Sequence, residues 1–136
     1  MAKNHFTTKN IILIVIVLAI LTVAFTTFFI FILKPENVIK KTIPAIATDY
    51  YENYFYPEIT KDNVNSLSNI FSKYTDTGFS PITFRQLLFY NNKYPSDTIN
   101  TIVNHCDLRN SYIQIYPTPP FGKFDYHIDY HYTCQF

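Results

Sequence analysis

The side chains best suited to metal binding lie in one short segment near the C-terminus: Asp125, His127, Asp129 and His131. They alternate with apolar residues, so on a β-strand they share one face, with neighbours about 6.5–7 Å apart. At this spacing His127 with Asp129, or Asp129 with His131, could bind one ion through the ligand types that zinc prefers. The segment 111–116 offers only Ser, Gln and Tyr as a third ligand. A solvated polar strand face explains the same residues, so a metal site is the alternative interpretation.

The two cysteines, Cys106 and Cys134, could form either a disulfide bond or a reactive thiol. His105 precedes Cys106, but adjacent side chains on a helix point about 100° apart, which does not favour a thiolate–imidazole pair. An even number of cysteines in a small exported domain is typical of a disulfide. We therefore predict a Cys106–Cys134 bond that closes a loop of about 28 residues.

Other patterns of catalytic residues are missing from the sequence. Two glycines, Gly78 and Gly122, are too few for a phosphate-binding loop, and neither a nucleophile elbow nor a CxxC pair is present. We expect the protein to be neither an enzyme nor a cofactor-binding protein.

The densest aromatic run is Asp49–Tyr56, with the sequence DYYENYFY. On a helix, Tyr50 and Tyr54 can join a core, while Tyr51 and Phe55 lie on a neighbouring strip. Exposed aromatic side chains are typical anchors of protein contacts, so Tyr51 and Phe55 are the candidate partner-binding residues. Core packing or a position close to a membrane explains the same run.

The elements that would position these residues begin with four short helices, predicted from apolar spacings of three and four. The first runs from Glu36 to about Tyr56, is kinked or divided at Pro44, and ends at Pro57. Capping and proline signals place the start of the others at Thr60 or Asp62, at Ser80-Pro81, and at Tyr94-Pro95-Ser96-Asp97; the second of the four ends at Thr77-Gly78.

The C-terminal part changes to a period of two, which is typical of strands. Residues 111–116 are β-branched and aromatic, residues 117–123 form a turn, and residues 124–136 alternate without a fault. A lone hairpin is marginal in water, so it must pack on the helices. The predicted fold class is α+β, with about four short helices and a C-terminal antiparallel β-hairpin.

An apolar run from Ile11 to Leu33 precedes this domain and contains no charge, proline or glycine. A helix of this length measures about 35 Å, enough to cross a hydrocarbon core of about 30 Å. The run is longer than the apolar core of a cleaved signal peptide. We predict a head at residues 1–10, a transmembrane helix at 11–33, and one domain at 34–136.

The orientation of the span is predicted from cysteine usage. Lysines flank both ends of the apolar run, so the positive-inside count is ambiguous. Both cysteines lie on its C-terminal side, where a disulfide would need an oxidising compartment. We expect the N-terminus to be cytoplasmic and the domain at 34–136 to be extracytoplasmic.

The charge of the tail restricts its partners. Residues 34–136 are close to neutral and have no basic stripe, which argues against nucleic acid. The expected partners are the lipid bilayer and another envelope protein. The favoured function is non-catalytic binding at the cell envelope.

Three segments, DYYENYFY at 49–56, GFSPITFRQLLFY at 78–90 and YHIDYHYTCQF at 126–136, resemble a group of uncharacterised short single-pass membrane proteins of reduced-genome bacteria. This resemblance implies a class and a compartment, and it carries no activity. The N-terminal apolar helix and a cysteine near the C-terminus are similar to type IV pilin-like subunits. Those subunits carry Gly-Phe-Thr and a glutamate where this chain has His5-Phe6-Thr7 and Asn10. A divergent pilin-like subunit is therefore a further alternative.

Overall fold

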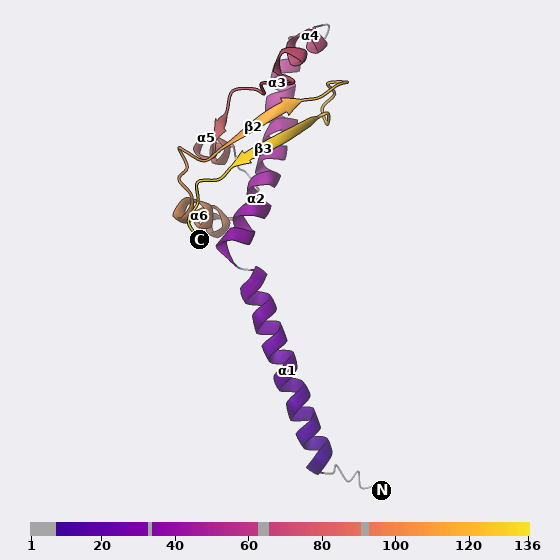
Figure 1. Cartoon of the computed structure of the whole chain (residues 1–136), viewed down its shortest axis with the longest axis vertical. Coiled ribbons are helices and arrows are strands. Elements are labelled where there is room, and N and C mark those ends of the chain that lie inside the picture. Colours follow the sequence, from indigo (N-terminus) through magenta and orange to yellow (C-terminus); the bar gives the residue numbers. More distant parts are fainter. Residues whose placement is uncertain (1–7, 33, 63–65, 91–92) are drawn as a thin grey trace.

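The computed structural model describes residues 8–32, 34–62, 66–90 and 93–136, and it shows an α+β protein (Figure 1). A long N-terminal helix leads into a domain of several further helices and one antiparallel sheet of three strands. The fold class predicted from the sequence is confirmed at this level, and the sheet has one strand more than the predicted hairpin.

Helix α1 (Thr8–Ile32) contains the apolar run. Its segment Asn10–Ile30 is long and apolar enough to cross a membrane, and none of its most apolar stretch is buried against the rest of the protein. The hydroxyls of Thr22, Thr26 and Thr27 donate to backbone carbonyls of the preceding turn, so they add no unpaired polar group to the helix surface. Leu33, the predicted last residue of the span, lies outside the described residues.

Residues 35–60 form one uninterrupted helical segment made of α2 (Pro35–Tyr50), a π-helical turn η1 (Tyr51–Phe55) and α3 (Tyr56–Thr60). The helix is therefore not divided at Pro44, which was one of the two outcomes predicted there, and the predicted end at Pro57 is wrong. A proline inside a helix removes one hydrogen bond and its ring crowds the carbonyl four residues earlier. The π-turn ends two residues before Pro57, and its wider spacing, with Tyr56 N–H donating to the Tyr51 carbonyl, relieves that crowding.

The next helical piece is shorter than predicted. Helix α4 (Leu67–Phe71) continues into a 3-10 turn η2 (Ser72–Tyr74), and residues 63–65, which include the expected Val64, lie outside the described part. Gly78 then adopts φ +68°, with its N–H donating to the Tyr74 carbonyl. The predicted stop at Thr77-Gly78 fits this left-handed turn, which glycine adopts without steric cost.

The third predicted helix does not begin at Ser80-Pro81. Residues 82–83 form a short strand β1 (Ile82–Thr83), and helix α5 (Phe84–Phe89) follows. The Thr83 side chain accepts from the Gln86 N–H while the Gln86 side chain accepts from the Thr83 N–H, a capping box that fixes the helix start after Thr83. Because β1 pairs with the first strand of the hairpin, the sheet gains its third strand.

Helix α6 (Ser96–His105) confirms the fourth predicted helix. Strands β2 (Tyr112–Pro117) and β3 (Tyr126–His131) form the predicted antiparallel hairpin, and the sheet order is β1-β2-β3. The predicted last strand at 124–136 is shorter in the structure. The expected alternation holds, because His127, Asp129 and His131 are exposed while the apolar residues between them are half-buried.

The core lies between the sheet and the helices. Ile39, Ile43, Ala47 and Tyr51 form the buried face of α2 and the start of η1, all 0% exposed. They belong to one cluster with buried residues of the other elements: Phe71, Phe79, Ile82, Phe84, Leu87, Ile102, Ile113 and Ile115. In Figure 1 the hairpin lies across α2, α5 lies beside the hairpin, and α6 lies toward the end of the domain nearer α1.

Candidate functional site

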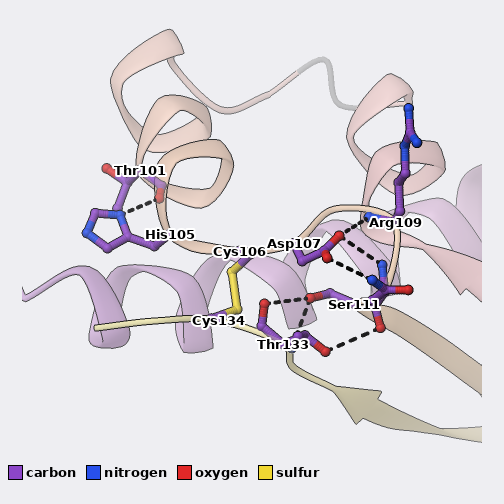
Figure 2. The surroundings of a disulfide bond; sticks show 9 residues. Thr101, His105, Cys106, Asp107, Arg109, Ser111, Thr133 and Cys134 are labelled. Carbon is purple, nitrogen blue, oxygen red and sulfur yellow. Dashed lines mark hydrogen bonds between the residues drawn. A yellow bond between two sulfur atoms is a disulfide. The ribbon is translucent and has the colours of Figure 1, made fainter.

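The predicted disulfide joins Cys106, directly after α6, to Cys134, after β3 (Figure 2). The two cysteines also form an antiparallel backbone bridge. Asp107 N–H donates to the Thr133 carbonyl and Gln135 N–H donates to the His105 carbonyl, each at 2.8 Å. The prediction is confirmed, and the bond fastens the chain end to the helical half of the domain.

A network of hydrogen bonds fixes the turn beside the disulfide. The Asp107 carboxylate accepts from the N–H groups of Arg109 and Asn110 and from the Asn110 amide, and these bonds hold the pKa of Asp107 below its ordinary value, the Asn110 side chain contributing most. The Ser111 hydroxyl, 0% exposed, accepts from the Thr133 N–H at 2.9 Å. Together with the disulfide, these hydrogen bonds fix the conformation of the turn at residues 107–111.

His105 does not form a catalytic pair with Cys106. Its Nδ1 lies 2.9 Å from the Thr101 carbonyl, one turn earlier on α6, and Figure 2 shows the ring pointing away from the sulfur atoms. The cysteine sulfur is bonded to Cys134. The arrangement supports the structural interpretation of this cysteine.

In the described part of the chain, the predicted metal-binding residues are not joined by a third ligand. The rings of His127 and His131 stack on Tyr116 and Tyr112 of β2. Asp129 lies opposite Gln114 in the β2–β3 register. Within residues 8–32, 34–62, 66–90 and 93–136, no three His, Cys, Asp or Glu side chains come together in a group that could hold a metal ion.

Asp125 does not share the strand face as predicted, because β3 begins at Tyr126. Its carboxylate accepts a hydrogen bond from the Gly122 N–H at 2.7 Å, and its backbone N–H donates to the Gly122 carbonyl. Asp125 is therefore a turn residue of the β2–β3 connection, since its short carboxylate side chain can bond to nearby backbone.

The predicted exposed strip of the aromatic run needs correction. Tyr51 is 0% exposed and its ring centroid lies 4.1 Å from that of Tyr126, while Tyr54 is 51% exposed. The sequence pattern placed Tyr54 in the core and Tyr51 outside it. The buried face in fact contains Ile43, Ala47 and Tyr51, which are spaced four residues apart. Because Ala47 has a small side chain, the apolar pattern did not identify this face as the buried one. Phe55 is half-buried, and it lines a cavity.

This cavity, of about 300 Å³, is the candidate binding site, and we name it the aromatic pocket. Its walls come from the end of α2, η1, η2, the segment before β1, the first residue of β1, α5 and the residue that follows α5. None of the described residues that line it is charged; they are Tyr50, Phe55, Tyr74, Phe79, Ser80, Pro81, Ile82, Gln86 and Tyr90.

Exposed aromatic rings continue from the aromatic pocket onto the surface. The Tyr90 ring lies 5.0 Å from Tyr50 and 4.3 Å from Tyr54, measured between ring centroids. Phe89 makes an edge contact with Tyr90 and is 83% exposed. Burial raises the pKa of Tyr50 further above its ordinary value, so this lining phenol is neutral. The site can offer ring faces and neutral hydrogen-bonding groups to a ligand.

Sequence reasoning identified Phe55 but missed the other walls of the aromatic pocket. Tyr74 and Phe79 flank the left-handed Gly78, and Tyr90 follows the last residue of α5. These residues are brought together only by tertiary packing. A glycine stop beside aromatic residues was the available signal, and it indicates a turn without indicating what the turn faces.

No family model matches the chain, and no curated protein or solved structure matches it either.

Proposed function

We propose that the chain is a single-pass membrane protein whose C-terminal domain lies outside the cytoplasm and binds another envelope protein without catalysis. In this proposal residues 1–10 are the cytoplasmic head, α1 is the anchor, and the aromatic pocket is the binding site. The observation that carries the binding role is the uncharged aromatic pocket with exposed rings at its rim.

The unburied apolar surface of α1 supports the anchor. Leu13, Phe25 and Ile30 are 64%, 65% and 65% exposed, and such a continuous apolar surface is unfavourable in water. A bilayer would remove it from water over the length of the helix. The disulfide supports an extracytoplasmic domain, because such bonds persist in oxidising compartments.

The chemistry of the aromatic pocket supports binding over catalysis. Tyrosine and phenylalanine are enriched at the cores of protein interfaces, and tyrosine is among the residues that most often dominate the binding energy when they lie in a pocket. The volume is at the lower end of the range for ligand sites, about 300–1,000 Å³. Ser80 and Gln86 add neutral hydrogen-bonding groups to the lining. A partner with an uncharged side chain or loop fits this lining.

Topology is tested by protease treatment of intact cells and of opened cells. The proposal expects the domain to be cleaved in intact cells and a tag on the head to survive there. Protection of the domain in intact cells, with its cleavage only after opening, would reverse the proposed orientation.

Binding is tested by site-specific photocrosslinking in cells. A photoreactive residue replaces Phe89 at the rim of the aromatic pocket, and the matched control replaces Phe124, which is 72% exposed in the β2–β3 connection. We expect a discrete adduct from position 89 that is lost in the Tyr54→Ala background and absent from position 124. Equal capture at both positions would contradict a site at the aromatic pocket.

A further inference from the structure

A second cavity, of about 590 Å³, lies where α1, α2 and α6 approach one another, and we name it the junction cavity. One wall is Ile32, the last residue of α1, and the opposite wall includes Thr98 near the start of α6. Tyr94, shortly before α6, also lines the cavity, and helix α2 supplies the other lining residues: Asn37, Val38, Lys41, Thr42 and Ala45.

The lining of the junction cavity combines two chemistries. Ile32, Val38 and Ala45 are apolar, whereas Lys41 is a cation and Thr98 carries a hydroxyl. A ligand that fills this site needs an anionic or strongly accepting group joined directly to an apolar one. The aromatic pocket has no cation, so the two cavities suit different ligands.

Lys41 is the cation of the junction cavity and makes no ion pair with any residue that the structure describes. Its neighbour Lys40 is bonded to Glu36 at 2.6 Å and does not line the cavity. Lys93 is likewise bonded to Asp49. The side chain of Lys41 is exposed and therefore available to an incoming anion.

The position of the junction cavity selects a lipid. One of its apolar residues, Ile32, ends the helix that the proposed function places across the bilayer, so the cavity opens at the level of the lipid headgroups. A phospholipid meets this requirement, because its anionic phosphodiester is joined to the apolar chains of diacylglycerol. Lysine is a common point-charge ligand of phosphate.

We propose that the junction cavity binds one phospholipid, with Lys41 donating to the phosphodiester oxygens and Ile32 and Val38 contacting the upper part of the acyl chains. This inference depends on the proposed membrane anchor. It goes beyond that proposal because it assigns one lipid site with a defined headgroup contact.

The test uses the full chain, extracted in mild detergent and titrated with phosphatidylglycerol while native mass spectrometry counts bound lipid. Lys41→Gln removes the proposed phosphate ligand, and Lys40→Gln removes the same charge one residue away. We expect about fivefold weaker lipid binding for Lys41→Gln and little change for Lys40→Gln. Val38→Trp, which fills the cavity and keeps both lysines, is expected to weaken binding as well.

Two further ligands test whether the phosphate and the acyl chains of the lipid are both recognised. A glucosyl diacylglycerol without phosphate and soluble glycerophosphate without acyl chains should each bind more weakly than phosphatidylglycerol. Equal losses for Lys41→Gln and Lys40→Gln would reveal a general attraction to anionic lipid and overturn the site. Preference for glycerophosphate would overturn the lipid assignment. A chain that fails to enter membranes would overturn the anchor too, whereas a chain that integrates and binds lipid independently of Lys41 would overturn this inference alone.

Discussion

The rings of Tyr116 and His127 lie face to face across the β2–β3 hairpin, with centroids 4.7 Å apart and planes inclined by 4°. Tyr112 and His131 form a second such pair, with centroids 4.3 Å apart and planes inclined by 17°. The paired residues Gln114 and Asp129 lie between the two ring pairs. The exposed face of the hairpin is therefore organised by cross-strand ring pairs. They are the unit by which an exposed sheet face gains stability.

The Tyr116–His127 pair should contribute measurably to stability. A double-mutant cycle with Tyr116→Ala and His127→Ala is expected to give a coupling energy of about 0.2–1 kcal/mol. The same cycle with Tyr116→Ala and His131→Ala joins residues that are not partners, and its coupling should be close to zero. Denaturant unfolding of the full chain in detergent measures both. Equal coupling in the two cycles would show that the stack is not the source.

Replacing Tyr51 with phenylalanine should not destabilise the protein. The Tyr51 hydroxyl is buried and has no hydrogen-bond partner among the residues that the structure describes, and a buried unpaired polar group costs about 1–3 kcal/mol. Tyr51→Phe keeps the ring contact with Tyr126 and is expected to raise the free energy of unfolding. Tyr51→Ala should lower it by about 3–5 kcal/mol, because the ring leaves a cavity. A loss of stability in Tyr51→Phe would mean that the hydroxyl is bonded in solution.

Gly78 should be the glycine that tolerates substitution less. It has φ +68°, and an added Cβ would lie 2.8 Å from the Gln114 Cγ and 3.0 Å from the Tyr116 Cε1. We expect Gly78→Ala to cost about 1–3 kcal/mol, from the backbone conformation alone. Gly122→Ala is the matched control, since its Cβ would approach only the carboxylate end of Asp125 and its φ is not positive. Its cost should be smaller by the same unfolding measurement.

Loss of the disulfide should weaken the domain strongly. The bond joins residues separated by 28 positions, and the chain-entropy model gives about 3–4 kcal/mol for such a loop. The Cys106→Ser, Cys134→Ser double variant should unfold at correspondingly lower denaturant concentration. The reduced wild-type chain is its control and should behave in the same way. Identical stability of the oxidised and reduced chains would contradict this role.

The protein should lose stability in strong alkali through two half-buried phenols, those of Tyr126 and Tyr132. Burial raises the pKa of Tyr126 to about 12 and that of Tyr132 to about 12, from an ordinary value of 10.0. A raised pKa in the folded state gives stability that is complete below pH 10 and is lost as the pH rises toward 12. Tyrosinate absorbance should show these phenols ionising well above the exposed ones. Tyr132→Phe should make the free energy of unfolding less dependent on pH in that range.

Local signals predicted the α+β class, helix α6, the β2–β3 hairpin and the cysteine pair. Strict alternation around Ile128 fixed the strand face, and Pro95 with Ser96 marked the start of α6. The predictions that failed were those in which tertiary packing overrode a local sequence signal. Pro44 and Pro57 ordinarily end helices, but packing of α2 on the sheet and the π-turn η1 keep residues 35–60 helical.

The residues of the candidate binding site show the same difference between local signals and tertiary packing. Phe55 could be found because it lies in a dense aromatic run, whereas Tyr74 and Tyr90 come from separate elements that meet only in the folded chain. Strand β1 was missed because its two residues gain their strand character only by pairing with β2. Sequence patterns within one helix or strand therefore predicted local structure, whereas contacts between residues of different elements could not be predicted from such patterns.

The unbroken helical segment at residues 35–60 has a mechanical consequence. Tyr50 and Tyr54 lie 15 to 19 residues after Pro35, which corresponds to about 22–29 Å along a helix axis. In the proposed topology this segment is a stem that raises the aromatic pocket above the lipid surface. A partner anchored in the same membrane would have to project about as far to reach it, so the length of the stem selects partners by height as well as by chemistry.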